Sequence, residues 1–183
     1  MPDTQWRRYE VFLQTEKRRP HQNVGSVHAP DGEMALLMAR DVFVRRPPCA
    51  SLWVAPAEHI LSRTAHELEH AAWPEEEGDP QVQAEFYYVF QKQKEAGSPT
   101  FVGAVEAVSP GQALRRALAV FAQSKALVWW VFPVGSVTSS AAGDVESMFE
   151  PAVDKSFRDQ ADYHTVARMK GIKKGFGGTR GNS

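Results

Sequence analysis

Two histidines and a glutamate in the segment AHELEH, residues 65–70, have the spacing of a catalytic metal site. His66, Glu67 and His70 follow the order H-E-x-x-H. On one face of a helix, two imidazoles at this spacing can bind one Zn²⁺, and the glutamate between them can activate a zinc-bound water. This is the ligand pattern of a zinc peptidase, so the segment is a candidate metal site.

The residues that follow favour a simpler interpretation of this motif. Zinc peptidases need a third ligand, but Trp73 stands where the extended motif has glycine, and Glu69 puts a charge at a position that usually packs inside. The glutamates at positions 75–77 lie in an acidic stretch rather than on a second helix. We therefore expect a solvated helix face, and we keep the histidine pair and its glutamate as a weak metal candidate.

Size and composition are those of an ordinary globular protein. The chain has 183 residues, 43% of them hydrophobic and 23% charged, with a formal net charge of -1, which is enough for one domain or two small ones. It has no long apolar run, and its N-terminal segment lacks the apolar stretch of a signal peptide. The single Cys49 can form neither an internal disulfide nor a zinc knuckle. We expect a cytoplasmic protein without membrane contact.

The C-terminal segment from Asp154 onward is basic and rich in glycine. Seven Lys and Arg stand against three Asp, so binding to nucleic-acid phosphates must be considered. Against it, the aromatic residues lie mostly in other parts of the chain, and no Arg-Gly-Gly array is present. We expect no nucleic acid as a partner, and a flexible tail that either docks on an acidic protein surface or makes no contact.

The chain contains an internal repeat. Four blocks match in order: residues 9–12 with 87–90, 24–29 with 102–107, 35–43 with 113–121 and, after a one-residue deletion, 52–56 with 129–133. The first three blocks recur at one constant offset in the numbering. Several matching blocks in the same order, with one small gap, indicate a duplication.

Each copy predicts two strands, a helix and a third strand. Alternating aromatic and β-branched residues are typical of half-buried strands, and an i, i+4, i+7, i+8 apolar stripe predicts the helix. Gly25 and Gly103 suggest a bulge or a close approach in the second strand of each copy. Asp31 can cap the first helix, whereas Ser109 and Gln112, with a proline between them, form a capping box for the second.

These elements predict an α+β fold of two similar units with antiparallel sheets, packed around a pseudo-two-fold axis. The units cover residues 6–60 and 85–140, and residues 61–84 form a helical and acidic linker between them. We expect an amphipathic helix over residues 57–73, and residues 141–183 form a C-terminal extension. The apolar stripe of that linker helix consists of Leu61, Ala65, Leu68 and Ala72.

Three segments of the first copy carry a family resemblance. YEVFLQ, VGSVHAPDGEMALLMARDVFVRR and SLWVAP together resemble the B subunit of the multicomponent phenylacetyl-CoA ring-1,2-epoxidase of aerobic bacterial phenylacetate degradation. The resemblance covers roughly residues 6–60 and is most specific from Val24 to Arg46. The second copy resembles this family only through the repeat. This chain would therefore be a long, duplicated form, and its oligomeric arrangement stays open.

The resemblance implies a non-catalytic role and no cofactor in this chain. In that oxygenase, a helical subunit carries a carboxylate-bridged di-iron site, a second helical subunit supports it, and a reductase with FAD and a [2Fe-2S] cluster supplies electrons. The B subunit is thought to assemble or bridge the helical pairs. The sequence agrees, because neither repeat helix has the E-x-x-H spacing of a di-iron ligand and the chain has no cysteine set for a cluster.

The resemblance also predicts the partners. We expect this chain to bind the catalytic di-iron subunit and the helical structural subunit, with the reductase as a further candidate, and to form a homo-oligomer. The alternative function is a self-contained small α+β enzyme or ligand-binding protein that uses the cleft between its halves. A zinc peptidase based on residues 66–70 is a remote alternative. No catalytic residue is assigned.

Two groups of residues are candidates for the partner interface. Arg40, Arg45 and Arg46 form a basic block that the second copy lacks. A salt-bridged surface is the simplest role for these arginines, although arginine also suits an acidic helical partner or a CoA phosphate.

The tryptophans of the last strand of each copy form the second group, with Trp53 and Trp130 as the candidates. Trp129 and Trp130 are adjacent, so they must point to opposite faces of their strand and one of them leaves the core of its own unit. That side chain packs either on the other copy or on another subunit.

Overall fold

The computed structural model describes residues 6–44, 48–70, 83–121 and 125–149, and it confirms two units with the same order of elements. The first unit contains β1 (Arg7–Gln14), β2 (Gln22–Ala29), α1 (Gly32–Phe43) and β3 (Ser51–Pro56). The second contains β5 (Glu85–Lys92), β6 (Thr100–Ala107), α3 (Pro110–Val120) and β7 (Val128–Pro133). In both units the first strand lies between the other two and pairs with each of them in antiparallel fashion.

Each unit contributes a further strand to the sheet of the other unit. After β3, the short 3-10 helix η1 (Ala57–His59) leads to β4 (Leu61–Thr64), which pairs with β7 of the second unit. After β7, the 3-10 helix η2 (Val134–Ser136) leads to β8 (Thr138–Ser139), which pairs with β3 of the first unit. Because β4 and β8 are exchanged in this way, backbone hydrogen bonds connect the two units.

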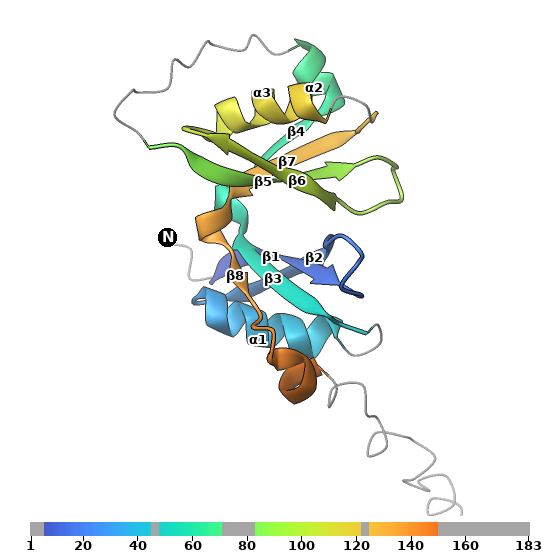
Figure 1. Ribbon diagram of the computed structural model, residues 1–183, viewed down its shortest axis with the longest axis vertical. Coiled ribbons are helices and arrows are strands. Elements are labelled where there is room, and N and C mark those ends of the chain that lie inside the picture. The colour runs from blue at the N-terminus through green and yellow to red at the C-terminus, as the bar shows by residue number, and fades with distance from the viewer. Residues whose placement is uncertain (1–5, 45–47, 71–82, 122–124, 150–183) are drawn as a thin grey trace, which may run out of the picture.

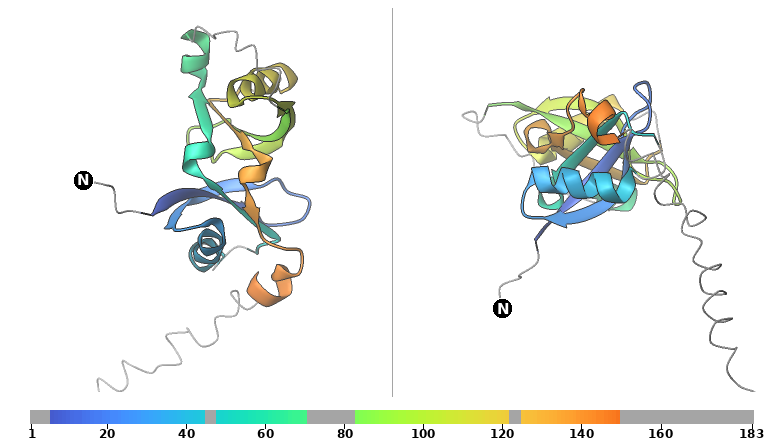
Figure 2. Two further views of the ribbon diagram at one scale, coloured as in Figure 1. Left: turned by 90° about the vertical axis from the view of Figure 1, so that its left-hand side faces the viewer. Right: turned by 90° about the horizontal axis from the view of Figure 1, so that it is seen from below.

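The eight strands of the described residues follow the order β4-β7-β5-β6-β2-β1-β3-β8, with the two halves of the sheet facing each other. Figures 1 and 2 show α1 on the outer side of one half and α3 on the outer side of the other. The halves meet at β2 and β6, where Gln22 pairs with Thr100. These layers confirm the α+β class and the antiparallel sheets.

Three apolar cores fill the spaces between these layers. One core lies between α1 and the strands of the first unit, and a second lies between α3 and the strands of the second unit. The third lies between the two half-sheets and is centred on Phe12, Ala55, Phe90 and Phe132, none of which has any exposed surface. The two units are therefore joined by a buried core as well as by the exchanged strands.

The glycine prediction is confirmed in both units. The pairing register shifts beside Gly25 in the first unit and beside Gly103 in the second. A Cβ atom at Gly25 would lie 2.9 Å from Cζ of Phe43, and one at Gly103 would lie 2.6 Å from Cζ of Phe121. The backbone of Gly25 also has φ +136°, which disfavours a side chain at this position.

The predicted helix caps are also confirmed. Oδ1 of Asp31 accepts a hydrogen bond from the N–H of Met34 at 2.8 Å, and Oγ of Ser109 accepts one from the N–H of Gln112 at 3.2 Å. The amide oxygen of Gln112 accepts a hydrogen bond from the N–H of Val108, at 3.0 Å, one residue before the cap. Each helix therefore begins where its side chains satisfy the free backbone donors.

The predicted linker helix over residues 57–73 is wrong for its first half. Residues 61–64 are the strand β4, and the helix α2 covers only Ala65–His70, while residues 71–73 lie outside the described ranges. The strand forms because the edge of β7 offers a row of backbone partners to residues 61–64. Leu61 and Leu68, assigned to one helical stripe, both pack against the core of the second unit, but from different elements.

Candidate functional site

The H-E-x-x-H segment forms the exposed helix α2, and its glutamate caps that helix. The Oε2 atom of Glu67 accepts hydrogen bonds from the backbone N–H of Thr64 at 2.7 Å and from its hydroxyl at 2.9 Å. In return, Oγ1 of Thr64 accepts one from the N–H of Glu67 at 3.2 Å. These donors hold the pKa of Glu67 below its usual value. The T-x-x-E signal of this capping box was present in the sequence but was missed.

The two histidines of the motif lie side by side on α2. The rings of His66 and His70 are stacked with their centroids 4.4 Å apart, and Nδ1 of His70 lies 2.9 Å from the carbonyl oxygen of His66. Across the described parts of the chain, no group of three or more His, Cys, Asp and Glu side chains is placed to hold a metal ion. The structure thus brings His66 and His70 together, whereas the carboxylate of Glu67 is bound by Thr64 at the start of the helix.

Trp53 and Trp130 both lie, half-buried, between the two units. Trp53 is stacked on Tyr88 of the second unit at 4.8 Å between ring centroids, and Trp130 and Phe12 of the first unit pack edge to face at 6.3 Å between centroids. Trp129, in contrast, is buried in the core of its own unit. The sequence left two packing partners open for the tryptophan that points away from its own unit, the other copy or another subunit. The structure shows Trp130 in contact with the other copy.

A buried histidine that the sequence did not single out lies beside Trp53. The His21 ring is stacked on the indole at 3.6 Å between centroids, and within the described residues its Nε2 atom is buried without a hydrogen-bond partner. Burial lowers the pKa of His21 to about 4, because the charged imidazolium would lose its hydration. No sequence pattern predicted this position, since the partners of His21 come from different parts of the chain.

Only one member of the predicted arginine group lies in the described part of the chain. Arg40 is on α1 and forms an ion pair with the neighbouring Asp41, at 2.7 Å between nitrogen and oxygen. Arg45 and Arg46 lie outside the described residues. Of the three arginines, the structure therefore places Arg40 alone, on the outer helix of the first unit.

The outer faces of α1 and α3 differ in chemistry although their backbones are equivalent. On α1, Met34 and Leu37 are exposed large apolar residues. The matching positions of α3 hold Gln112 and Arg115. The sequence comparison of the two copies contained this signal, but it was not used. One outer helix face with exposed apolar residues and an equivalent one with polar residues are typical of two surfaces with different contacts.

No helix in the described ranges is both long enough and apolar enough to cross a membrane.

Comparison with known proteins points to one family. The family described as phenylacetic acid degradation B matches residues 5–79 and 83–170, one segment on each unit. The B subunit of the 1,2-phenylacetyl-CoA epoxidase of Escherichia coli (strain K12) is 39% identical over 79 residues, which cover 43% of this chain and 74% of the relative. No solved structure matches. The chain belongs to the phenylacetic acid degradation B family.

Proposed function

We propose that this chain is a non-catalytic bridging subunit of a multicomponent phenylacetyl-CoA epoxidase in phenylacetate degradation. It would join a catalytic di-iron subunit to a helical structural subunit, with the reductase as a further partner. The di-iron site, the FAD and the [2Fe-2S] cluster would reside on those other subunits. Family membership and the relative named as the B subunit of such an epoxidase support this assignment.

One structural observation carries the bridging role. A bridging subunit needs two surfaces, and the duplicated chain presents two equivalent outer helices on opposite sides of the molecule (Figure 1). One of them has the exposed Met34 and Leu37, whereas the other has Gln112 and Arg115 at those positions. Surfaces on equivalent helices with different side-chain chemistry suit two different partners.

The remaining features agree with a role in assembly. The space between the two units, which an enzyme of the alternative kind would use as its cleft, is filled by Phe12, Phe90 and Phe132. The glutamate of the H-E-x-x-H motif is engaged by Thr64 at the start of α2. We further propose a homo-oligomer that acts in the cytoplasm.

A matched pair of variants tests the bridging surfaces. Val42 and Val120 occupy equivalent positions near the ends of α1 and α3, and both are more than half exposed. We expect Val42→Arg, combined with Leu37→Arg, to raise the dissociation constant for one of the helical partners about tenfold or more, as for an anchor residue. Val120→Arg should leave that same contact unchanged.

Size-exclusion chromatography and affinity measurements on the full chain with each subunit would give the answer. Circular dichroism should show that every variant keeps its fold, because the substituted side chains point to solvent. If the α1 variants bind both helical subunits as well as the unmodified chain does, the α1 surface is not a contact and this basis for the proposal fails.

A further inference from the structure

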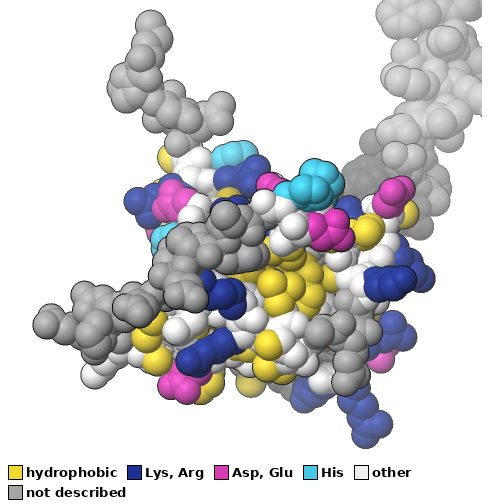
Figure 3. Space-filling model, turned by 90° about the horizontal axis from the view of Figure 1, so that it is seen from above, with side chains coloured by type: hydrophobic (Ala, Val, Ile, Leu, Met, Phe, Trp, Pro, Cys, Tyr) yellow, Lys and Arg dark blue, Asp and Glu magenta, His cyan; other side chains and the backbone are white. Residues whose placement is uncertain are grey.

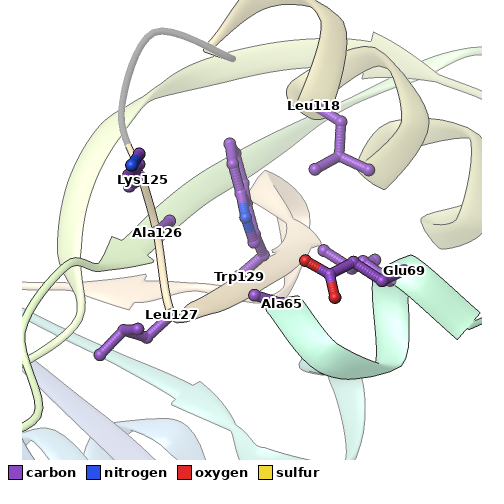
Figure 4. Close-up of a pocket in the computed structure, with 8 residues that line it drawn as sticks. Ala65, Glu69, Leu118, Lys125, Ala126, Leu127 and Trp129 are labelled. Carbon is purple, nitrogen blue, oxygen red and sulfur yellow. The ribbon is translucent and has the colours of Figure 1, made fainter.

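An open groove lies on the outer side of the second unit, between α2, α3 and the start of β7 (Figure 4). Its volume is about 590 Å³. Glu69 and Lys125 carry the charges of the groove, and its large apolar side chains are Leu68, Leu118, Leu127 and Trp129. The space-filling view from this side shows apolar side chains gathered at the centre of the face, with charged groups around them (Figure 3).

The first unit has a helical turn at the position equivalent to α2, and this turn carries a buried aromatic ring. The helical turn η3 (Val145–Phe149) follows β8 as α2 follows β4. In the alignment that places β7 on β3, Val145 corresponds to Leu68, and each packs against the core of the unit that received its strand. Phe149, at the end of this turn, is only 2% exposed and belongs to the core of the first unit.

The surroundings of Phe149 correspond to the lining of the groove. The core that contains Phe149 also contains Cys49 and Leu52, which correspond to Ala126 and Trp129 in the second unit. Both of these line the groove. The groove of the second unit therefore lies against the counterparts of two residues that share a core with Phe149.

The residue that corresponds to Phe149 in the other copy is small. In the same alignment Phe149 matches Ala72, which lies outside the described residues and whose side chain is a methyl group. The groove is large enough for a ring, since an apolar cavity of about 150 Å³ already holds benzene. An open apolar surface at this place would gain free energy from a ring that covers it.

We infer that the groove between α2 and α3 binds an aromatic side chain of a partner subunit, at the place that Phe149 fills in the first unit. The inference rests on the proposed bridging function and adds the position and chemistry of one contact.

Cysteine labelling of the full chain tests this contact. Leu118→Cys places a thiol in the groove, and Ala96→Cys, in the exposed turn between β5 and β6 and away from both outer helices, is the control. The native Cys49 gives a low background, because it is buried and burial raises its pKa to about 11. The labelling rate with a maleimide is followed by intact mass, for the chain alone and for its complex with the helical subunits.

We expect Leu118→Cys to react at least tenfold more slowly in the complex than in the isolated chain, while Ala96→Cys reacts equally in both. Equal rates for Leu118→Cys in both states would overturn the inference and leave the bridging function intact. A thiol that is already protected in the isolated chain would also overturn it, because the chain would then fill its own groove.

A second measurement keeps the two proposals separate if no complex forms. Chromatography of the unmodified chain with the subunits decides the bridging function by itself. The isolated Leu118→Cys chain is then labelled in the presence of a synthetic peptide of residues 141–150, which contains Phe149. Protection by this peptide and not by its Phe149→Ala version supports the groove as an aromatic site, and equal effects of the two peptides count against it.

Discussion

Phe12 and Phe90 occupy equivalent positions in the two copies, and their rings meet at 4.5 Å between centroids. Equivalent residues of the two units are therefore in direct contact between the half-sheets. Each is completely buried, and Phe132 packs against both, at 5.3 Å from Phe12 and 5.4 Å from Phe90. This contact shows that the duplicated units form one folded body, in which either unit completes the core of the other.

Truncating either ring should destabilise the whole chain. Phe12→Ala and Phe90→Ala each remove a fully buried phenyl ring, which costs about 3–5 kcal/mol of the free energy of unfolding. The double variant should lose less than the sum, because each ring has already lost its partner in the single variant. Urea unfolding followed by circular dichroism measures all three.

Phe86→Ala is the control for this experiment, since Phe86 lies on the same strand as Phe90 and is 59% exposed. It should change the free energy of unfolding by less than about 1 kcal/mol. Two separate unfolding transitions in the unmodified chain, one for each unit, would contradict the single folded body.

Gly25→Ala should destabilise the first unit for two reasons that can be separated. The new Cβ would lie 2.9 Å from Cζ of Phe43, and the backbone φ of +136° is unfavourable for alanine. Together these effects should cost about 1–3 kcal/mol. Thermal unfolding of Gly25→Ala with and without Phe43→Leu gives the share of each, since the smaller side chain removes only the clash.

Gly143→Ala is the matched control, because nothing lies within 4 Å of a Cβ at that position. A loss of stability at Gly143 as large as that at Gly25 would show that the close approach to Phe43 is not the cause.

The buried His21 should make the fold sensitive to acid. Its pKa is about 4 in the folded chain and near 6.5 in the unfolded chain, so between these values the unfolded chain binds a proton that the folded chain does not. Lowering the pH from 7 to 4.5 should therefore favour unfolding. His21→Phe, which keeps a ring against Trp53, should remove this contribution, which is at most about 1.4 kcal/mol per pH unit.

The measurement is the free energy of unfolding of the two proteins at several pH values. Subtracting the free energy of unfolding of the unmodified chain from that of His21→Phe cancels the contributions of the other titrating groups. This difference should increase, so that the variant becomes relatively more stable, as the pH falls below 6.5. A difference that is independent of pH would show that His21 is not a buried neutral imidazole.

The H-E-x-x-H motif should not bind a metal ion. His66→Ala should not change the metal content of the purified chain, because Glu67 is used as the helix cap and α2 is exposed. Elemental analysis of the chain purified without added zinc checks this. One zinc per chain that disappears in His66→Ala would restore the metal-site interpretation.

The repeat made most of the fold predictable. The matching blocks of the two copies located the paired strands, both long helices and the two glycines, because local patterns and caps decide these elements. The exchange of β4 and β8 was not predictable in this way. Leu61, Ala65 and Leu68 have helical spacing, and only the unpaired edge of β7, which comes from a distant part of the chain, makes residues 61–64 a strand.

The candidate site was predictable to a smaller extent for the same reason. That Trp129 and Trp130 point to opposite faces followed from strand geometry, but their packing partners did not. The contact of His21 with Trp53 and the burial of Phe149 depend on how the two units pack together. The different outer faces of α1 and α3 were visible in the aligned copies, as Leu37 and Arg115 show.

The proposed bridging function makes this chain an assembly subunit that does not itself catalyse the reaction. Its most direct test is co-expression with the catalytic di-iron subunit and the helical structural subunit, followed by size-exclusion chromatography with light scattering and an assay of O₂-dependent epoxidation of phenylacetyl-CoA with the reductase added. We predict a complex that contains this chain, and a loss of its size or activity when the chain is omitted. The proposed bridging function would be contradicted if the complex of the other subunits were unchanged and fully active without this chain, and if the chain eluted alone.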